Sequence, residues 1–397
     1  MSLRRLALFS VLLLLVAGTA TALNPVNVGV TSSNSYLTAN NIESSQIIIS
    51  VTDGTWKAIG GANVLLEVPA PWGLADTTGV TNAGGVVVTT FLPTTVSGTA
   101  TITATVTVPG ITTEPVVRTY NQNIVADVPA KAVYSYPSTV SVGSINDITV
   151  RVTDRYGNPV TSTKQPNLVS FTTTLGGDSG FLISGHHFDV KVKALSVALN
   201  DSGYAETNFA VSTRAGDNFV YIGPPAPLPA NLIRIQGIAN LPPETILQTV
   251  TPQGKPPTLT TDGVSRFILT YDLLDKYGNP SAHQNLSIST TGGEAMVITS
   301  SSEGKVAISY GPRTLAGRYT ITARSQENSK VSVTQVVQFL SGKATNMLLT
   351  ASPQTMASLD VKPDAVAWVT GKVIDASGNP VAGETVCFSI QSVNTGA

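Results

Sequence analysis

Two short segments of the chain carry the residue types of a catalytic site. Residues 177–180 read GDSG, which places Ser179 between small residues as a hydrolytic nucleophile requires. Such a serine needs a histidine base that a carboxylate orients. His186, His187 and His283 all follow Ser179, which is the wrong order for the protease fold that uses this tetrapeptide. We therefore predict a glycine-rich loop here, and no catalytic residue in the chain.

The second segment has the chemistry of a metal site. Residues 185–189 read GHHFD, and His186, His187 and Asp189 are weak candidates for zinc ligands. Neighbouring residues of a strand point to opposite faces, so the two imidazoles would not converge on one ion. Asp127, Asp154 and Asp275 are too scattered in sequence for a calcium loop. The sequence thus predicts a surface loop, with no metal and no cofactor.

A third pattern recurs along the chain. Residues 154–159 read DRYGNP, residues 275–280 read DKYGNP and residues 375–380 read DASGNP, and a degenerate copy begins at Asp53. The aspartates are separated by 101, 121 and 100 residues, which is the spacing of domains. The structural turn residues of the three complete copies are Asp154, Gly157, Asn158, Pro159, Asp275, Gly278, Asn279, Pro280, Asp375, Gly378, Asn379 and Pro380.

Each hexapeptide suits a sharp turn between two strands. Aspartate can accept backbone hydrogen bonds, glycine tolerates a positive φ, and proline sends the chain into an extended segment. Apolar residues alternate before each aspartate, which predicts a strand with one face on a core. These residues are Ile47, Ile49 and Val51, then Ile148, Val150 and Val152, then Leu269, Tyr271 and Leu273, and finally Val369 and Val373.

Further turn signals follow every 8 to 12 residues, as in immunoglobulin-like sandwiches. The predicted fold class is all-β: tandem immunoglobulin-like (Ig-like) β-sandwich domains arranged like beads on a string, the last one incomplete. The expected domains are 24–125 (degenerate), 131–240, 244–340 and 344–397, the last being an N-terminal half only. Domain two carries an insertion at 175–198, which is the first choice for a partner-binding loop, followed by residues 222–237.

Composition and the N-terminus indicate the compartment. The net charge is −1 and only 12% of residues are charged, so a nucleic-acid partner is not expected. Residues 1–22 have a basic start, a short apolar run and an A-x-A ending, typical of a signal peptide. We expect an exported, extracellular or cell-surface protein with no membrane span in the mature chain. Asn200 and Asn285 are possible glycosylation sites, and Cys387 is expected to be buried in a strand.

The turn segments resemble a known family. VTDRYGNPV, LLDKYGNPS and VIDASGNPVAGETVCFSI are similar to the strand-turn-strand signature of bacterial Ig-like domains of group 1, which form the stalks of invasin- and intimin-type adhesins. The resemblance covers most of residues 131–397 and, more weakly, 24–125. It implies a surface or secreted stalk, and says nothing about a ligand.

Three functions fit these observations. The first is a non-enzymatic extracellular stalk or adhesin whose partner is an unknown surface protein or glycan. The alternative is a set of accessory Ig-like modules from an exported polysaccharide-active enzyme. A carbohydrate-binding module would need an exposed aromatic platform, but Trp56, Trp72 and Trp368 are far apart in sequence.

Overall fold

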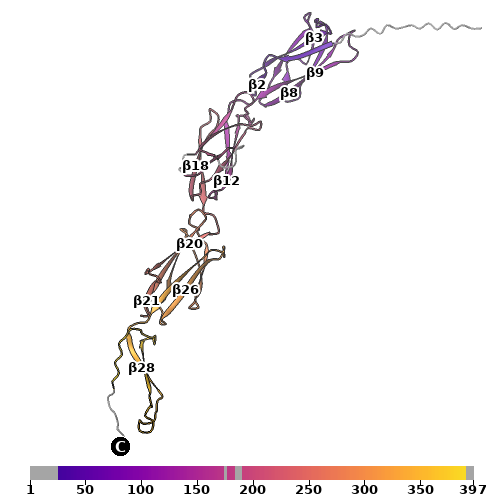
Figure 1. Cartoon of the computed structure of the whole chain (residues 1–397). Helices are drawn as coiled ribbons and strands as arrows, with labels where there is room; N and C mark the ends of the chain where they lie inside the picture. The colour runs from indigo at the N-terminus through magenta and orange to yellow at the C-terminus, as the bar shows by residue number, and fades with distance from the viewer. Residues whose placement is uncertain (1–25, 174–176, 184–189, 390–397) are drawn as a thin grey trace, which may run out of the picture.

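The computed structural model describes residues 26–173, 177–183 and 190–389, and within these residues the regular elements are all strands. Compact β-units follow one another end to end, so the chain is an extended rod (Figure 1). The units comprise residues 26–125, 131–238, 245–340 and 344–389, and are called the first to fourth unit. No helix suited to crossing a bilayer occurs in the part of the chain that the structure describes.

Two sheets form the first unit. Its strands are β1 (Val26–Ser32), β2 (Tyr36–Thr38), β3 (Ser45–Asp53), β4 (Asn63–Glu67), β5 (Gly73–Leu74), β6 (Thr78–Val80), β7 (Val86–Leu92), β8 (Gly98–Thr107) and β9 (Val116–Val125). The sheet orders are β1-β3-β7-β5 and β2-β9-β8-β4-β6. Within this unit β2 and β9 pair in parallel, and the other strand pairs are antiparallel. The chain thus starts in one sheet and crosses to the edge of the other, as in an Ig-like sandwich.

The second unit repeats this plan. Its strands are β10 (Lys131–Ser135), β11 (Thr139–Ser141), β12 (Ile145–Thr153), β13 (Leu168–Thr173), β14 (Gly180–Leu182), β15 (Lys191–Val192), β16 (Ala194–Ala198), β17 (Tyr204–Ala210), β18 (Gly216–Gly223) and β19 (Asn231–Ile238). The sheets are β10-β12-β17-β14-β15 and β11-β19-β18-β13-β16. The parallel pair is now β11 and β19, which is the place that β2 and β9 occupy in the first unit.

The third unit has the same arrangement, and the fourth has one strand pair. The strands are β20 (Thr245–Thr251), β21 (Thr258–Thr260), β22 (Phe267–Leu274), β23 (Asn285–Thr290), β24 (Ala295–Thr299), β25 (Lys305–Tyr310), β26 (Gly317–Ser325), β27 (Ser332–Leu340), β28 (Ala344–Ser352) and β29 (Trp368–Asp375). The sheets are β20-β22-β25, β21-β27-β26-β23-β24 and β28-β29. The predicted all-β fold of tandem Ig-like sandwiches is confirmed.

Alternating apolar residues build a separate core in each of the first three units. All nine residues predicted for the inner faces of β3, β12 and β22 have no exposed surface. Burying one such side chain contributes about 1.5–3 kcal/mol, so these strands anchor their units. In the fourth unit Val369 is 56% exposed and Cys387 is exposed. The expected burial of Cys387 is therefore wrong, since no second sheet covers this unit among the described residues.

The insertion of the second unit is more ordered than a surface loop. Among its described residues, β14 and β15 pair with each other and extend one sheet, whereas β16 pairs with β13 in the other. Phe181 is fully buried, and its ring lies 5.9 Å from Phe171 and 5.3 Å from Phe209 between centroids. Residues 177–179 of the GDSG segment lie outside the strands, as predicted for a loop, and lead into the core strand β14, so that both Ser179 and Phe181 are buried.

Candidate functional site: the repeated joint between units

Each DxxGNP hexapeptide adopts the same capped turn at the end of a strand. In the third unit, the amide of Asp275 donates to the carbonyl of Asn279 at 2.9 Å, and the amide of Gly278 donates to the carbonyl of Asp275 at 3.0 Å. Oδ1 of Asp275 accepts from the amides of Tyr277 and Asn279 at 2.8 Å each. The same four bonds measure 2.8 to 3.2 Å in residues 154–158 and 2.9 to 3.0 Å in residues 375–379.

The glycine and the proline of the hexapeptide have distinct tasks. Gly157, Gly278 and Gly378 have φ values of +89°, +84° and +83°, in the region where a side chain costs energy. The proline then pairs with the residue before the aspartate, for example Pro159 with Thr153 in an isolated antiparallel bridge. The turn thus closes tightly and fixes the position of the asparagine side chain.

The second carboxylate oxygen of each aspartate holds the linker that enters its unit. Oδ2 of Asp154 accepts from the amide of Asp127 at 3.0 Å. The equivalent bonds run from Asn240 to Asp275 at 3.0 Å and from Gly342 to Asp375 at 2.8 Å. Each aspartate therefore ties its own turn and the incoming linker together.

The asparagine reaches across to the preceding unit. Nδ2 of Asn158 donates to Oδ2 of Asp154 at 2.7 Å and to the carbonyl of Thr95 at 2.8 Å, while its Oδ1 accepts from the amide of Ser97 at 2.9 Å. Both ends of the carboxamide thus bind the backbone of one loop of the first unit. The same pair of bonds joins Asn279 to Thr213 and Ala215 (2.8 and 2.7 Å), and Asn379 to Thr314 and Ala316 (2.7 and 2.9 Å).

We call residues 95–97, 213–215 and 314–316 the receiving loops. A joint is one turn together with its receiving loop and linker, and the first, second and third joints contain Asn158, Asn279 and Asn379. Each receiving loop reads Thr-x-Ser or Thr-x-Ala, and glycine follows as the first residue of β8, β18 or β26. The loop offers one carbonyl and one amide, which are the two groups that a carboxamide can bind at once. Recognition therefore depends on the loop's backbone shape more than on its side chains.

The paired aspartate and asparagine are buried at every complete joint. Asp154, Asp275 and Asp375 are each 2% exposed, and Asn158, Asn279 and Asn379 are 9%, 6% and 5% exposed. Buried polar groups of this kind stabilise a structure only when they are hydrogen-bonded, because an unpaired one costs about 1–3 kcal/mol. Here every polar atom of the two side chains has a partner, so the joint holds one defined geometry.

Hydrogen bonds to the charged form also set the acidity of two of these carboxyl groups. Burial alone would raise the pKa of Asp275, but the bonds from Asn279, Asn240 and Tyr277 outweigh burial and lower it. The pKa of Asp375 is lowered far below its ordinary value in the same way, with the amide of Gly342 among the donors. Both carboxyl groups are thus ionised at neutral pH, and the charged form accepts the hydrogen bonds of the linker and turn amides.

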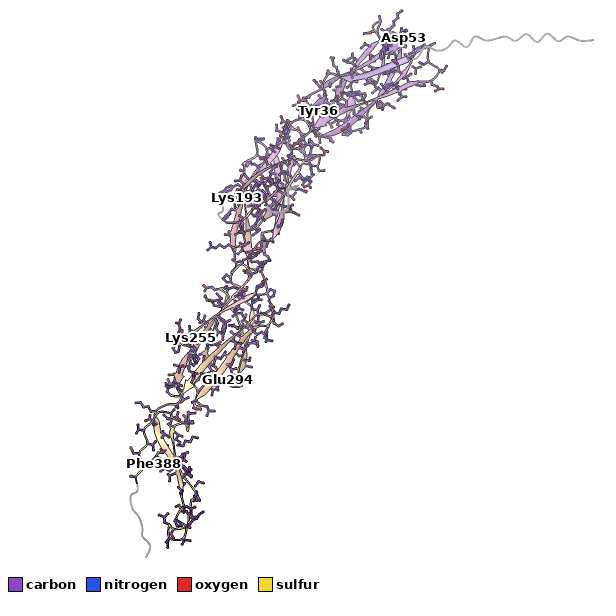
Figure 2. All side chains as sticks on the ribbon, in the orientation of Figure 1. Tyr36, Asp53, Lys193, Lys255, Glu294 and Phe388 are labelled. Carbon is purple, nitrogen blue, oxygen red and sulfur yellow. The ribbon has the colours of Figure 1, made fainter. Side chains whose placement is uncertain are left out.

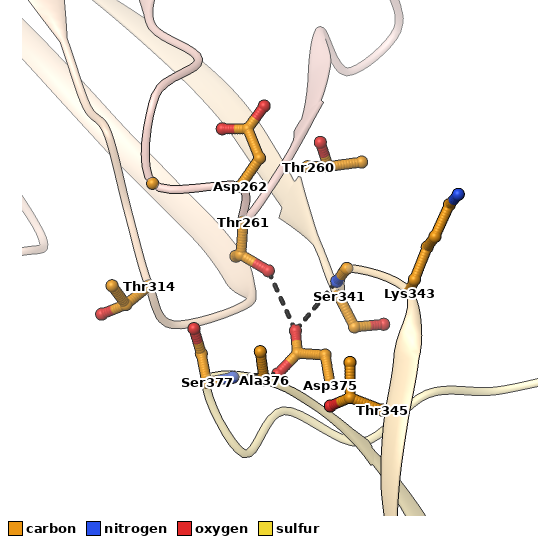
Figure 3. A pocket seen from close by; sticks show the side chains of 12 residues that line it. Thr260, Thr261, Asp262, Thr314, Ser341, Lys343, Thr345, Asp375, Ala376 and Ser377 are labelled. Carbon is orange, nitrogen blue, oxygen red and sulfur yellow. Dashed lines mark hydrogen bonds between the residues drawn. The ribbon is translucent and has the colours of Figure 1, made fainter.

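The third joint has an open cleft beside it (Figure 3). Its volume is about 700 Å³, and Asp262, Lys343 and Ser377 lie on its walls. On its floor, Oγ1 of Thr261 and the amide of Gly342 both donate to Oδ2 of Asp375, at 3.1 and 2.8 Å. Oδ2 of Asp375 is thus already hydrogen-bonded within the protein. The cleft is a gap between the end of the third unit and the start of the fourth.

The first copy forms the turn but lacks the asparagine. The amide of Asp53 donates to the carbonyl of Lys57 at 2.9 Å, and Oδ1 of Asp53 accepts from the amides of Thr55 and Lys57 at 2.8 and 3.0 Å. Trp56 takes the glycine position with φ +70° and is 77% exposed. Figure 2 shows Asp53 at the end of the first unit that faces away from the second, whereas Tyr36 lies near their junction.

Of the remaining predicted residues, the structure describes Ser179, Asn200 and Asn285, which lie in three different local environments. His186, His187 and Asp189 lie outside the described residues, and no cluster of three or more metal-binding side chains occurs among the residues that are described. Ser179 is 1% exposed, and its hydroxyl has no hydrogen-bond partner within the described part of the chain. Asn200 caps the turn before β17 through the amides of Ser202 and Tyr204. Asn285 accepts from the Thr299 hydroxyl at 2.8 Å.

Sequence reasoning gave the hexapeptide a turn function only and missed its contact with the preceding unit. A signal was present in the spacing. The asparagine follows the receiving-loop threonine by 63, 66 and 65 residues, although the second unit carries an insertion. The separation varies by only three residues, so the two motifs keep nearly the same spacing across each boundary between units.

Tandem Ig-like β-sandwich domains are the class of structure that this fold defines. The match between the chain and the solved structure of FdeC, an Escherichia coli adhesin, has a TM-score of 0.50 at 16% identity, and covers 80% of this chain and 99% of that one. InvD of Yersinia pseudotuberculosis gives a TM-score of 0.47 at 17% identity, over 78% and 97% of the two chains. The match to FdeC confirms, at the level of the fold, the resemblance seen in the turn motifs.

In sequence, the chain is similar to the inverse autotransporter adhesin YeeJ of Escherichia coli K12. The two are 26% identical over 384 residues, which is 94% of this chain and 15% of YeeJ. The chain therefore spans a small part of the length of that relative. No protein-family model matches the chain.

Proposed function

We propose that the chain is a non-enzymatic, adhesin-type stalk in which Ig-like domains act as a stiff extracellular spacer. One observation carries the proposal: at three successive joints, a buried aspartate and asparagine fix the next unit to the backbone of the one before it. In this proposal the domains are 24–125, 131–240, 244–340 and 344–397, and residues 1–22 are a signal peptide.

The joint is built to resist bending. A unit that tilts away must break two hydrogen bonds of the asparagine, each contributing about 1 kcal/mol. It also strains the bond between the linker amide and the aspartate, which is stronger because the acceptor is charged. A flexible linker would have none of these constraints. Stiff joints let a rod hold its far end at a fixed distance, which is what a stalk does mechanically.

The proposed location is the cell surface or the extracellular space, and the proposed partner is a surface protein or a glycan. FdeC and YeeJ are named as adhesins, and we extend adhesion to this chain on that basis and on its extended form. Accessory modules of a polysaccharide-active enzyme receive no comparable support from the relatives. Catalytic function is not part of the proposal, because all three histidines follow Ser179 in the sequence, which does not suit the protease fold that uses a GDSG segment.

The proposal can be tested by measuring distances between units in solution. Spin labels would be placed at Thr119→Cys, Ser196→Cys or Ser289→Cys, which are exposed positions in the first, second and third units, in a Cys387→Ser background. We expect narrow distance distributions between neighbouring units in the parent protein. The triple variant Asn158→Ala, Asn279→Ala, Asn379→Ala should broaden them and shorten the largest dimension seen by small-angle scattering.

The matched control is Asn200→Ala. Asn200 also caps a turn with two amides, at 3.0 Å each, but it bonds no residue of another unit. This variant should leave the distances between units unchanged. Broad distributions in the parent protein, as wide as in the triple variant, would refute the stalk proposal.

A further inference from the structure

The receiving loop of the second unit is held from both sides. The carbonyl of Thr213 accepts from Nδ2 of Asn279 at 2.8 Å, across the joint. The amide of the same residue donates to Oδ1 of Asp178 at 3.0 Å, within the second unit. Thr213 is thus a direct backbone bridge between the insertion of the second unit and the turn of the third.

Asp178 is well placed to support the loop. Its Oδ1 also accepts from the hydroxyl of Ser212 at 3.0 Å, and that hydroxyl accepts from the amide of Arg214 at 3.1 Å. One carboxylate oxygen therefore orders three successive residues of the loop. The main chain around Asp178 is fixed as well, because the Lys191 ammonium donates to the carbonyl of Asp178 at 2.8 Å.

The neighbouring lysine adds a second attachment. The Lys193 ammonium donates to the carbonyls of Gly177, at 3.1 Å, and Ser179. Both lysines lie in or beside β15 of the insertion, so the insertion fastens the segment 177–179 onto its own sheet. The segment is consequently a rigid support, even though Asp178 itself lies at the surface.

The other two receiving loops are supported by different chemistry. In the first unit, Nε1 of Trp72 donates to the carbonyl of Val96 at 3.3 Å. In the third, Arg313 precedes the loop and bonds the hydroxyl of Tyr310 at 2.9 Å, with its guanidinium carbon 4.9 Å from the ring centroids of Tyr310 and Tyr319. Each joint thus has its own support, and only the second joint takes it from the insertion.

We propose that Asp178 is a positioning residue of the second joint, which holds residues 213–215 in the shape that accepts Asn279. This inference rests on the proposed function, since it concerns the stiffness of the same joints. In this proposal the described part of the insertion helps to set the distance and angle between the second and third units, through the contact of Asp178 with Thr213 inside the second unit.

The acidity of Asp178 agrees with this geometry. Burial would raise its pKa, but the bonds from Thr213 and Ser212 outweigh burial and lower the pKa to about 2. The charged carboxylate is therefore the form that binds the loop. Lys191 and Lys193 face this segment, and both direct their ammonium groups to its carbonyls. The support is expected to act at any pH above the ordinary carboxyl range.

The experiment compares two joints in one protein. Labels at Ser196→Cys and Ser289→Cys report the second joint, and labels at Thr119→Cys and Ser196→Cys report the first. We expect Asp178→Ala to raise the disengaged fraction at the second joint about fivefold, which is the effect of losing about one net hydrogen bond. The first joint should not change. Asp178→Asn keeps an oxygen acceptor without the charge, so it should release the second joint less than Asp178→Ala does.

The outcomes separate the two proposals. If Asn279→Ala broadens the second joint and Asp178→Ala does not, the positioning function of Asp178 is wrong and the stalk proposal stands. If Asn279→Ala also leaves the second joint unchanged, the proposed function itself fails. Amide exchange of the β17 and β18 strands checks that the second unit stays folded. A loss of its core protection in Asp178→Ala would show a general structural effect and overturn the specific inference.

Discussion

Replacing Asn158 by alanine should release the first joint while both units remain folded. The carboxamide makes two bonds across the joint, to Thr95 and Ser97, and each contributes about 1 kcal/mol net. A loss of about 2 kcal/mol raises the ratio of disengaged to engaged joints about 30-fold. If about 1% of the parent joints are disengaged, as is common for a minor state, the variant would show roughly a quarter.

The assay is the distribution of distances between labels at Thr119→Cys and Ser196→Cys. A second population in Asn158→Ala is the expected result, and Asn200→Ala supplies the control because it removes two turn bonds without touching the joint. Asn158→Asp should release the joint at least as strongly. Its second oxygen would face the Asp154 carboxylate, from which Nδ2 lies 2.7 Å away, and like charges at that distance repel.

An unchanged distribution in both Asn158 variants would refute the reasoning. It would mean that the linker between residues 125 and 131, with its bond from Asp127 to Asp154, is sufficient to fix the joint. Thermal unfolding is measured in parallel, since loss of the bond to Asp154 should also lower the free energy of unfolding of the second unit by about 1 kcal/mol. A much larger loss would indicate that the variant disrupts the fold.

Three further results are expected. Because the pKa of Asp275 is lowered from 3.8 in the folded chain, its contribution is complete well above that pH and is lost as the pH falls through the folded value. Label distances at the second joint should therefore widen in acid below about pH 3.8 and stay constant from pH 6 to 8. Gly278→Ala should lower the free energy of unfolding measured in urea by about 1 kcal/mol, because φ is +84° at this position. Gly73→Ala is the control, since Gly73 is equally free of contacts within 4 Å but has no positive φ, and it should cost little. Equal losses of stability in the two variants would contradict the prediction. Tyr271→Phe should raise the stability of the third unit by up to about 1 kcal/mol, because the Tyr271 hydroxyl is buried without a hydrogen-bond partner in the described structure; a loss above 1 kcal/mol would disprove it.

The strands and cores could be predicted because they depend on local periodicity. Alternating residues such as Ile47, Ile49 and Val51 must share one face of a strand, and only a sandwich core can bury that face. The turn residues were equally readable, since glycine before asparagine and proline leaves few backbone shapes. These properties are fixed within ten residues of sequence, and no long-range information is needed to infer them.

The joint could not be read in the same way. Asn158 binds residues more than 60 positions upstream, and its partners are a carbonyl and an amide of the main chain. The short Thr-x-Ser or Thr-x-Ala segment of a receiving loop therefore does not by itself reveal the contact. The same reason explains why the sequence did not predict what the insertion contacts. Its extra length was visible, but its contact through Asp178 to Thr213 depends on how β14 and β15 fold back onto the sheet.

Backbone recognition also explains how the units can differ while the joints stay alike. The middle residues of the receiving loops are Val96, Arg214 and Leu315, two aliphatic residues and one cation. Val96 and Leu315 are 42% and 64% exposed. Within a unit, the distance from the turn aspartate to the receiving-loop threonine is 59 residues in the second unit, against 42 and 39 in the first and third.

From that threonine to the next asparagine, however, the separation is always 63 to 66 residues. The insertion at 175–198 therefore lengthens only the path between a unit's two ends, and leaves the path through the joint unchanged. Because the carboxamide binds a carbonyl and an amide of the main chain, it makes no bond to a side chain of the receiving loop. A rod built in this way can carry a larger unit, or a loop with a different middle residue, without losing the geometry of its connections.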